Sequence, residues 1–276
     1  MSPRVVFVIT ILVVLLLLFL VGPILGRPVF IAALAVIVYV GGPVLVRFTQ
    51  KQPAHPELAP VELQGLPAQV SEFFQRTAEN LAAEGFTPAA RLAYAQRNVA
   101  FVVELHLNRP AGDAAAAIAA YERTTDAARL KTSYVEFATE CADGSALDTN
   151  NSSVHIVLPQ RPGKRLLQLP DVQDVSLLYK VHRAALEEFT AAKKGRLPAP
   201  GEERSDLAAS MIKELVAAAD AGYMYLDETS DVYRPTWKGA FLMTWKSIWP
   251  GSAIVKARMR RKVAPILSQV TATEPR

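Results

Sequence analysis

The sequence predicts an α+β fold, with two N-terminal transmembrane helices followed by a soluble domain in which helices flank an antiparallel sheet. Three observations support this prediction. Two long apolar runs occupy residues 5–46. Alternation of apolar and polar side chains marks strands near residues 99–107 and 132–140. Apolar spacings of three and four mark helices before and after these strands.

The first apolar run, Val5–Val21, has Thr10 as its one polar side chain. As a helix it would span roughly 26 Å, slightly less than the ~30 Å hydrocarbon core of a bilayer. A second run, Val29–Val46, begins directly after Pro28, which suits the first position of a helix because its missing N–H is not needed there. The sequence therefore predicts a transmembrane hairpin over residues 1–48.

Two other interpretations compete with a transmembrane hairpin. A cleaved signal peptide would have a shorter apolar region followed by a cleavage site of small residues, and no such site lies at the right distance. A hairpin buried inside a soluble protein would need a very large apolar partner. Arg4, Arg47 and Lys51 flank one side of the hairpin and Arg27 the other. The positive-inside rule then places both termini in the cytoplasm, as in an integral membrane protein with two spans.

The charges are distributed unevenly along the 276 residues, whose formal net charge is +4. Residues 1–51 carry four basic side chains and no acid, and residues 253–276 carry six basic side chains and one acid. The body between them is acidic, which makes nucleic acid an unlikely partner and favours a lipid bilayer at the two ends. The single cysteine, Cys141, forbids a disulfide within the chain and fits a reducing compartment.

Residues 49–67 contain four prolines and predict a linker. The following segment, residues 68–192, is predicted to be an α+β domain with an antiparallel meander. It opens with a helix that has apolar residues at helical spacing between Val70 and Leu81 and a stop at Gly85.

In the strand 99–107 the odd-numbered side chains are apolar, while Glu104, His106 and Asn108 fall on the other face. This pattern predicts a half-buried strand. Residues 114–123 are ambiguous, because their alanines favour helix whereas their position between two strands favours a third strand. We favour the strand.

A strand over residues 132–140, a hairpin turn at Asp143-Gly144 and a short strand over Val154–Leu158 complete the predicted sheet. A helix with apolar residues from Val175 to Phe189 follows, with Asp171 or Asp174 as its cap.

Residues 193–205 predict a second linker, and residues 206–276 a helical region with a wing-like hairpin and an aromatic and basic tail. The segment Asp206–Phe241 runs from a helix capped by Asp206 into Gly222–Leu226, a polar turn, and a second extended stretch that ends in Thr236-Trp237-Lys238-Gly239. This arrangement resembles the end of a winged-helix domain. The resemblance implies that the helix is a recognition helix, but Lys213 stands there among acidic residues, which argues against DNA contact.

Four aromatic residues recur every fourth position near the C-terminus, and five basic residues follow them. The aromatic stripe is Trp237, Phe241, Trp245 and Trp249, and the basic run is Lys256, Arg258, Arg260, Arg261 and Lys262. Tryptophan favours the headgroup boundary and basic clusters attract anionic lipids, so these residues are the candidate membrane-surface contact. Alternatively, the aromatic residues pack into the domain and the basic run is solvated.

No residue pattern indicates a catalytic, cofactor or metal site. The histidines at positions 55, 106, 155 and 182 match no known ligand spacing. The oxygen-rich segment Asp143–Asn151 lacks the acidic pattern of a calcium loop, and no phosphate-binding loop or nucleophile motif is present.

Three functions are compatible with this sequence. The first, which we favour, is a membrane-anchored, non-enzymatic module that recruits or organises an unknown protein partner and contains no deep polar pocket. The second is a membrane-tethered regulator that uses the winged-helix-like segment. The third is an enzyme with an unrecognised site, which a deep cleft lined by Glu104, His106, Glu136 or His155 would support.

Overall fold

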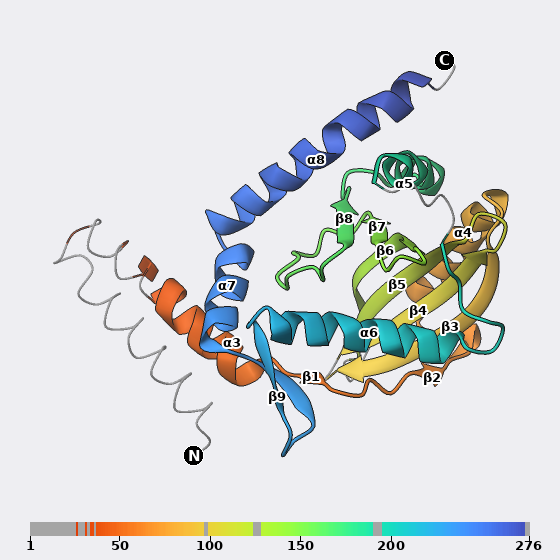
Figure 1. Ribbon diagram of the computed structural model, residues 1–276. Helices are drawn as coiled ribbons and strands as arrows, with labels where there is room; N and C mark the ends of the chain where they lie inside the picture. Colours follow the sequence, from red (N-terminus) through yellow and green to blue (C-terminus); the bar gives the residue numbers. More distant parts are fainter. Residues whose placement is uncertain are drawn as a thin grey trace. The chain divides into compact units, whose positions relative to one another are not determined.

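The structure, a computed structural model, is an α+β protein and describes residues 26, 31, 34–35, 37–96, 99–123, 128–189 and 195–273 (Figure 1). The chain forms two compact units that are interleaved along the sequence. Unit 1 contains the described part of Met1–Ala54 together with His155–Pro159 and Leu215–Ile254, and unit 2 contains the described parts of His55–Val154, Gln160–Glu214 and Val255–Arg276. Each unit is described by itself.

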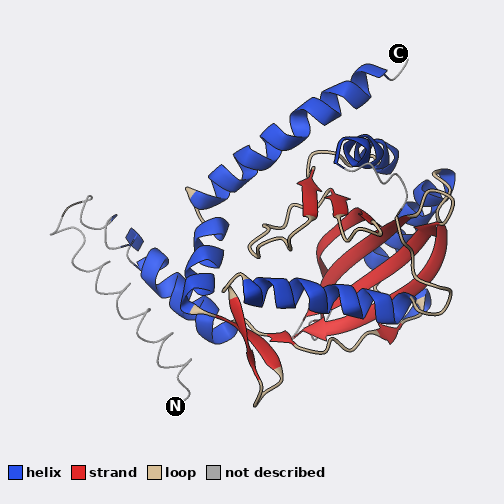
Figure 2. Cartoon of the chain, in the orientation of Figure 1, coloured by secondary structure: helices blue, strands red, loops and turns tan. Residues whose placement is uncertain are grey.

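Unit 2 is built on a seven-stranded sheet in which the strands follow one another in sequence order (Figure 2). The strands are β2 (Ala59–Pro60), β3 (Thr87–Gln96), β4 (Val99–Asn108), β5 (Asp113–Arg123), β6 (Ala128–Glu140), β7 (Ala146–Asn150) and β8 (Lys164–Gln168). All neighbours are antiparallel except β7 and β8, which are parallel. The predicted turn at Asp143-Gly144 joins β6 to β7, whereas the strand predicted over Val154–Leu158 is wrong, because these residues form a loop.

The alanine-rich segment is the strand β5, at the centre of this sheet. It pairs along most of its length with β4 on one side and with β6 on the other. The helix preference of an alanine is worth less than about 1 kcal/mol per residue, and backbone pairing with two neighbouring strands outweighs it.

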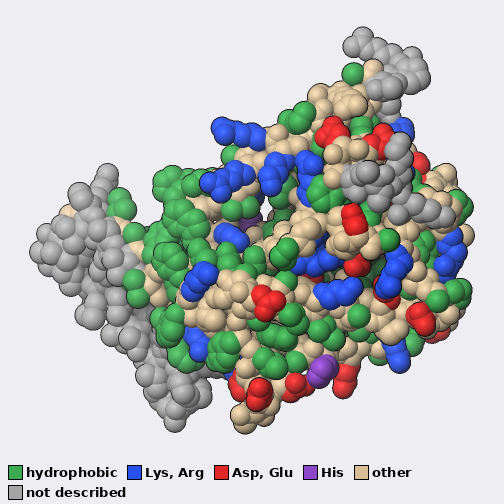
Figure 3. All heavy atoms as spheres, in the orientation of Figure 1, with side chains coloured by type: hydrophobic (Ala, Val, Ile, Leu, Met, Phe, Trp, Pro, Cys, Tyr) green, Lys and Arg blue, Asp and Glu red, His purple; other side chains and the backbone are tan. Residues whose placement is uncertain are grey.

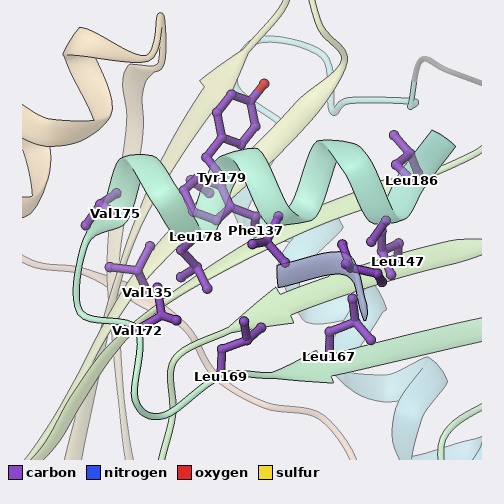
Figure 4. Close-up of a cluster of buried hydrophobic side chains, with 14 of the residues drawn as sticks. Val135, Phe137, Leu147, Leu167, Leu169, Val172, Val175, Leu178, Tyr179 and Leu186 are labelled. Atoms are coloured by element: carbon purple, nitrogen blue, oxygen red, sulfur yellow. The ribbon is translucent and has the colours of Figure 1, made fainter. Parts of the chain in front are cut away.

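Two helices, α4 (Ala68–Ala83) and α5 (Val175–Phe189), cover one face of the sheet. Gly85, with a φ of +83°, ends α4 as predicted, and Asp174 caps α5 by accepting a hydrogen bond from Ser176 N at 2.8 Å. The buried side chains beneath α5 form one continuous core (Figure 4). They include Val135, Phe137, Leu147, Leu167, Leu169, Val172, Val175, Leu178, Tyr179 and Leu186. Val263 and Ile266 of α8 (Gly251–Thr273) join the same core.

The strand β4 is buried on both faces, which corrects the prediction of a half-buried strand. Glu104, His106 and Asn108 are 3%, 1% and 8% exposed. They share the face of Val102, which packs against α4. The alternation in the sequence therefore reflects a polar cluster inside the protein rather than a solvated face.

The opposite face of the sheet is covered by α6 (Glu203–Asp220), whose residues up to Glu214 belong to unit 2. This helix starts three residues before the predicted cap at Asp206. Its side chains Leu207, Ala208 and Met211 pack over Leu92 of β3, Val103 and Leu105 of β4 and their neighbours, and Leu58, which precedes β2, joins the same cluster.

Unit 1 contains a three-stranded sheet and short helices. Its elements are the π-helix Ile37–Gly41, α3 (Gly42–Thr49), β1 (Gln52–Pro53), β9 (Met224–Asp227), β10 (Val232–Pro235) and α7 (Trp237–Ser247). The strand order is β1-β10-β9. Thr236 caps α7, as its hydroxyl oxygen accepts a hydrogen bond from Gly239 N at 2.9 Å.

The prediction of two transmembrane helices is contradicted. Among the residues that the structure describes, no helix combines the length and the apolar character needed to cross a bilayer. The first run, Val5–Val21, lies outside these residues. The described end of the second run breaks into the π-helix and the short α3 at Gly41-Gly42-Pro43, where proline removes a helical hydrogen bond. The predicted integral-membrane location, with two spans and both termini in the cytoplasm, is therefore not supported.

Within unit 1, α3 packs against α7 instead. A Cβ atom on Gly42 would lie 2.7 Å from Thr244 Cγ2, so the two helices touch there and a larger residue would require the Thr244 side chain to shift. The Tyr39 ring lies 6.2 Å from the Trp245 ring, between centroids. At these positions the described end of the run contacts protein, whereas Val38, Val40 and Leu45 are exposed.

Candidate functional site

Unit 2 contains a cavity of about 390 Å³ between the sheet and the first half of α6. This volume is within the range of small-molecule sites. Its walls are mainly apolar, and their larger side chains come from five elements, β3, β4, β5, β6 and α6. The larger wall residues are Tyr94, Phe101, Val103, Leu105, Ile118, Tyr134, Leu207 and Met211.

The floor of the cavity consists of alanines. Ala114, Ala116 and Ala120 of β5 and Ala138 of β6 present only a methyl group each beneath α6. Helix α6 rests on the larger side chains of β3 and β4, so it cannot sink onto this floor. A space remains because an unfilled gap forms wherever small side chains face a helix that neighbouring large residues hold away.

The other face of β5 is also lined by alanines, and there they belong to the cores beneath α4 and α5. Ala115, Ala117 and Ala119 are wholly buried on the side of α4 and α5. There the methyl groups allow close packing of the helices. The same residue type thus gives a tight core on one face and a cavity on the other.

One end of the cavity is polar and holds a chain of alternating charges. Lys164 Nζ lies 2.6 Å from Asp148 Oδ2 and 2.9 Å from Glu214 Oε1. Arg161 continues the chain, with Nε 3.5 Å from Glu214 Oε1 and Nη2 3.4 Å from Glu140 Oε1.

Lys213 completes this ionic chain, since its Nζ lies 3.2 Å from Glu140 Oε1. The chain thus contains three acids and three bases and is neutral. It also ties α6 to β6, β7 and β8, because Glu214 and Lys213 belong to that helix.

Glu136 is the carboxyl group at this end that stands outside the ionic chain. It points into the cavity from β6 and accepts a hydrogen bond from Asn150 Nδ2 at 2.7 Å. Among the described residues no lysine, arginine or histidine forms an ion pair with it. Burial in the cavity and then the negative charge of Asp148 raise the pKa of Glu136 to about 7.

The neighbours of Glu136 respond to the same confined environment. Burial raises the pKa of Asp148 although Lys164 opposes this shift. Burial alone would lower the pKa of Lys164, but Asp148 and Glu214 outweigh it and raise the pKa. Burial and the charge of Glu136 raise the pKa of the Tyr134 phenol. These pKa shifts indicate a site with little water, where an ionised group without a partner of opposite charge is energetically unfavourable.

A second polar cluster lies in the core beneath α5 and centres on Asp113, which is 0% exposed. Asp113 accepts hydrogen bonds from Thr139 Oγ1 at 2.6 Å, from Tyr179 Oη at 2.8 Å and from Arg183 Nη1 at 3.0 Å. The Thr139 hydroxyl has one proton and donates it to Asp113. Its oxygen therefore accepts a hydrogen bond from His182 Nε2, which lies 2.8 Å away.

His182 is therefore the neutral Nε2–H tautomer, and its Nδ1 accepts from Thr149 Oγ1 at 3.0 Å. Burial lowers the pKa of His182 to about 4. Because His182 is wholly buried and its hydrogen bonds are satisfied, this cluster joins α5 to the sheet rather than serving as a reaction site.

The other residues weighed for chemistry do not meet at one site. Glu104 pairs with Arg91, Nε to Oε2, at 2.8 Å, and His106 Nε2 lies 3.2 Å from Glu104 Oε1, all on the α4 face. His155 belongs to unit 1. Among the described residues, no group of three or more His, Cys, Asp or Glu side chains could hold a metal ion.

The candidate membrane-contact residues fall in both units. In unit 1, Trp237, Phe241 and Trp249 are 57%, 49% and 77% exposed, and Trp245 packs on Tyr39. In unit 2, the basic run lies on α8 with all five side chains exposed, and Figure 3 shows Lys and Arg side chains along that helix. Contact of these residues with anionic lipids remains a prediction.

Comparisons of the chain with protein-family models, with curated proteins and with solved structures found no match. The cavity must therefore be interpreted from its own residues. Glu136 is one of the four residues whose presence in a deep cleft would support an enzyme, but the cavity itself and its alanine floor were not predicted from the sequence. Two features of the sequence could have indicated them: alanines at both odd and even positions of β5, and Glu136 as an acid in the otherwise uncharged stretch 132–139 of β6.

Proposed function

We propose that unit 2 is a binding module for a small, mainly apolar molecule, which it holds between β5 and α6. The observation that carries this proposal is the alanine-floored cavity of about 390 Å³ with predominantly apolar walls. An apolar ligand would gain about 0.8 kcal/mol for each methylene group that it transfers from water into such a space.

The proposal favours binding over catalysis. A general acid–base site usually places a second free group beside the first. Here Asp148, the carboxylate of the charge network that acts most strongly on Glu136, is paired with Lys164 at 2.6 Å. A recruiting role, as favoured from the sequence, would be consistent with such a module if the bound molecule signals to a partner. A deep cavity with a polar end was not expected for that role.

The direct test uses 1-octanol as a probe and the full-length chain. Saturation-transfer difference NMR should show saturable binding with a dissociation constant on the order of 1 mM, at about 0.5 kcal/mol per non-hydrogen atom. Ala116→Leu places a larger side chain on the floor and should abolish the signal. Lys131→Met removes an exposed charge elsewhere on β6 and serves as the control.

Two results would refute this function. One is the absence of saturable binding by the wild-type chain. The other is binding that Ala116→Leu and Lys131→Met leave equally intact, because the probe would then occupy another surface.

A further inference from the structure

We propose that the ligand of this cavity carries a primary amine, which pairs with the carboxylate of Glu136 while its apolar part lies on the alanine floor. This inference rests on the proposed binding function and adds the chemical class of the ligand. It follows from the pairing of charges at the polar end of the cavity.

The carboxyl groups at the polar end of the cavity differ in whether they form an ion pair with a basic side chain. Asp148, Glu214 and Glu140 each have a lysine or arginine within 3.5 Å. Their charges are thus compensated inside the protein, and a cationic ligand would gain little by approaching them. In the described part of the chain, the side-chain hydrogen bond to Glu136 comes from the amide of Asn150, which is a neutral donor, and Lys164 acts on Glu136 without forming an ion pair with it.

The hydrogen bond from Asn150 engages one of the two carboxylate oxygens of Glu136. Asn150 Nδ2 donates to Oε2 of Glu136, which leaves Oε1 without a partner in the described part of the chain. An ionised carboxylate accepts several hydrogen bonds, so this oxygen is an open acceptor at the end of an apolar space.

Ligands whose polar group is an anion or a neutral hydroxyl fit this end of the cavity less well than an ammonium group. An anionic ligand would place its charge between Glu136 and Asp148 and would have to displace a lysine that already has two partners. A neutral hydroxyl would bond to Oε1 but would leave the charge of Glu136 uncompensated. An ammonium group satisfies both requirements, and charge-assisted hydrogen bonds are about twice as strong as neutral ones.

The charged groups around Glu136 come from three elements besides its own. Asp148 on β7, Lys164 on β8 and Glu214 on α6 act on its carboxyl group, and Tyr134 precedes it on the same face of β6. The titration of Glu136 is therefore expected to be visible in the binding of a cation.

The experiment compares three probes of equal chain length on the full-length chain: octylamine, 1-octanol and octanoate. Wild-type protein should bind octylamine about 10- to 100-fold more tightly than 1-octanol, the range for a hydrogen bond to a charged group. Glu136→Gln should remove this preference, so that octylamine binds no more tightly than 1-octanol. Glu140→Gln, which changes an already paired carboxylate in the same cavity, should preserve it.

A pH series on the wild-type chain provides a test that needs no variant. Octylamine stays protonated from pH 5 to pH 8, since alkyl amines titrate near 10. Its affinity should rise about tenfold per pH unit up to the pKa of Glu136, about 7, and then level off. Binding of 1-octanol should show no such rise.

The outcomes separate this inference from the proposed function. Equal affinity for octylamine and 1-octanol, or a preference for octanoate, would overturn the amine assignment while the cavity remains a binding site. Failure of all three probes to bind would overturn the proposed function itself.

Discussion

The pH dependence of stability is the sharpest test of the two unusual titrating groups, His182 and Glu136. Burial lowers the pKa of His182 from 6.5 to about 4. Between these values the unfolded chain binds a proton that the folded chain does not. The free energy of unfolding therefore falls as the pH decreases from 6.5 to 4, by about 3 kcal/mol at 1.36 kcal/mol per unit.

Glu136 has the opposite effect in almost the same range. Its pKa rises from 4.5 to about 7 in the folded protein. Between pH 7 and pH 4.5 the folded chain binds a proton that the unfolded chain does not, so this group stabilises the protein as the pH falls. The full effect is again about 3 kcal/mol, or somewhat less because the Glu136 side chain is only partly buried.

The perturbations are His182→Gln and Glu136→Gln, each of which removes one of the two titrations. Both variants will shift stability at every pH, because hydrogen bonds also change, and the readout is therefore the slope. As the pH falls from 6.5 to 4.5, the free energy of unfolding of His182→Gln should rise by about 2–3 kcal/mol relative to that of the wild type. The free energy of unfolding of Glu136→Gln should fall by a similar amount relative to the wild type.

Urea denaturation followed by circular dichroism at four pH values gives the free energies of unfolding by linear extrapolation. Curves for the two variants that run parallel to the wild-type curve would refute the reasoning. So would slopes that change in the same direction, because the two groups are predicted to have opposite signs.

Five further substitutions test the packing, the ionic chain and a helix cap, with the same denaturation assay. Lys164→Met should cost about 3 kcal/mol because it leaves a buried carboxylate unpaired, whereas Lys131→Met breaks a surface pair of the same 2.6 Å length and should cost much less. Equal costs would contradict the role of burial. Ala117→Leu should destabilise the tight face of β5 by about 1–3 kcal/mol, while Ala116→Leu on the cavity floor should be neutral or stabilising; a reversed order would contradict the placement of the cavity. Thr236→Ala should cost about 1 kcal/mol by removing the cap of α7, and no change would mean that the cap contributes nothing.

Local patterns predicted much of the secondary structure. The period of the apolar residues and the stop at Gly85 located α4, and Asp174 was among the two candidate caps of α5. These signals act over a few residues, so they survive in almost any tertiary context. The strand Lys164–Gln168 escaped prediction because it is short and pairs in parallel with β7, so that no hairpin turn joins it to its neighbour in the sheet.

Length and apolarity alone misled the interpretation of the N-terminal region. A run such as Val29–Val46 has the composition of a transmembrane helix, yet its described end packs against α7 within unit 1. Hydropathy reports how apolar a segment is, and it does not distinguish lipid from protein as the apolar partner.

By itself, the sequence determined the α+β class, the principal helices and strands, and the position of β5 between two strands. Only the tertiary structure decided that both faces of the sheet are covered, that the alanines of β5 floor a cavity, and that Glu136 lines this cavity with no ion pair to a basic side chain of the described residues. The physical reason is distance along the chain: Lys164 and Glu214 are 50 residues apart, and Lys213 and Glu140 are 73 apart. Which charges are compensated, and which one faces an open space, depends on contacts that no local pattern encodes.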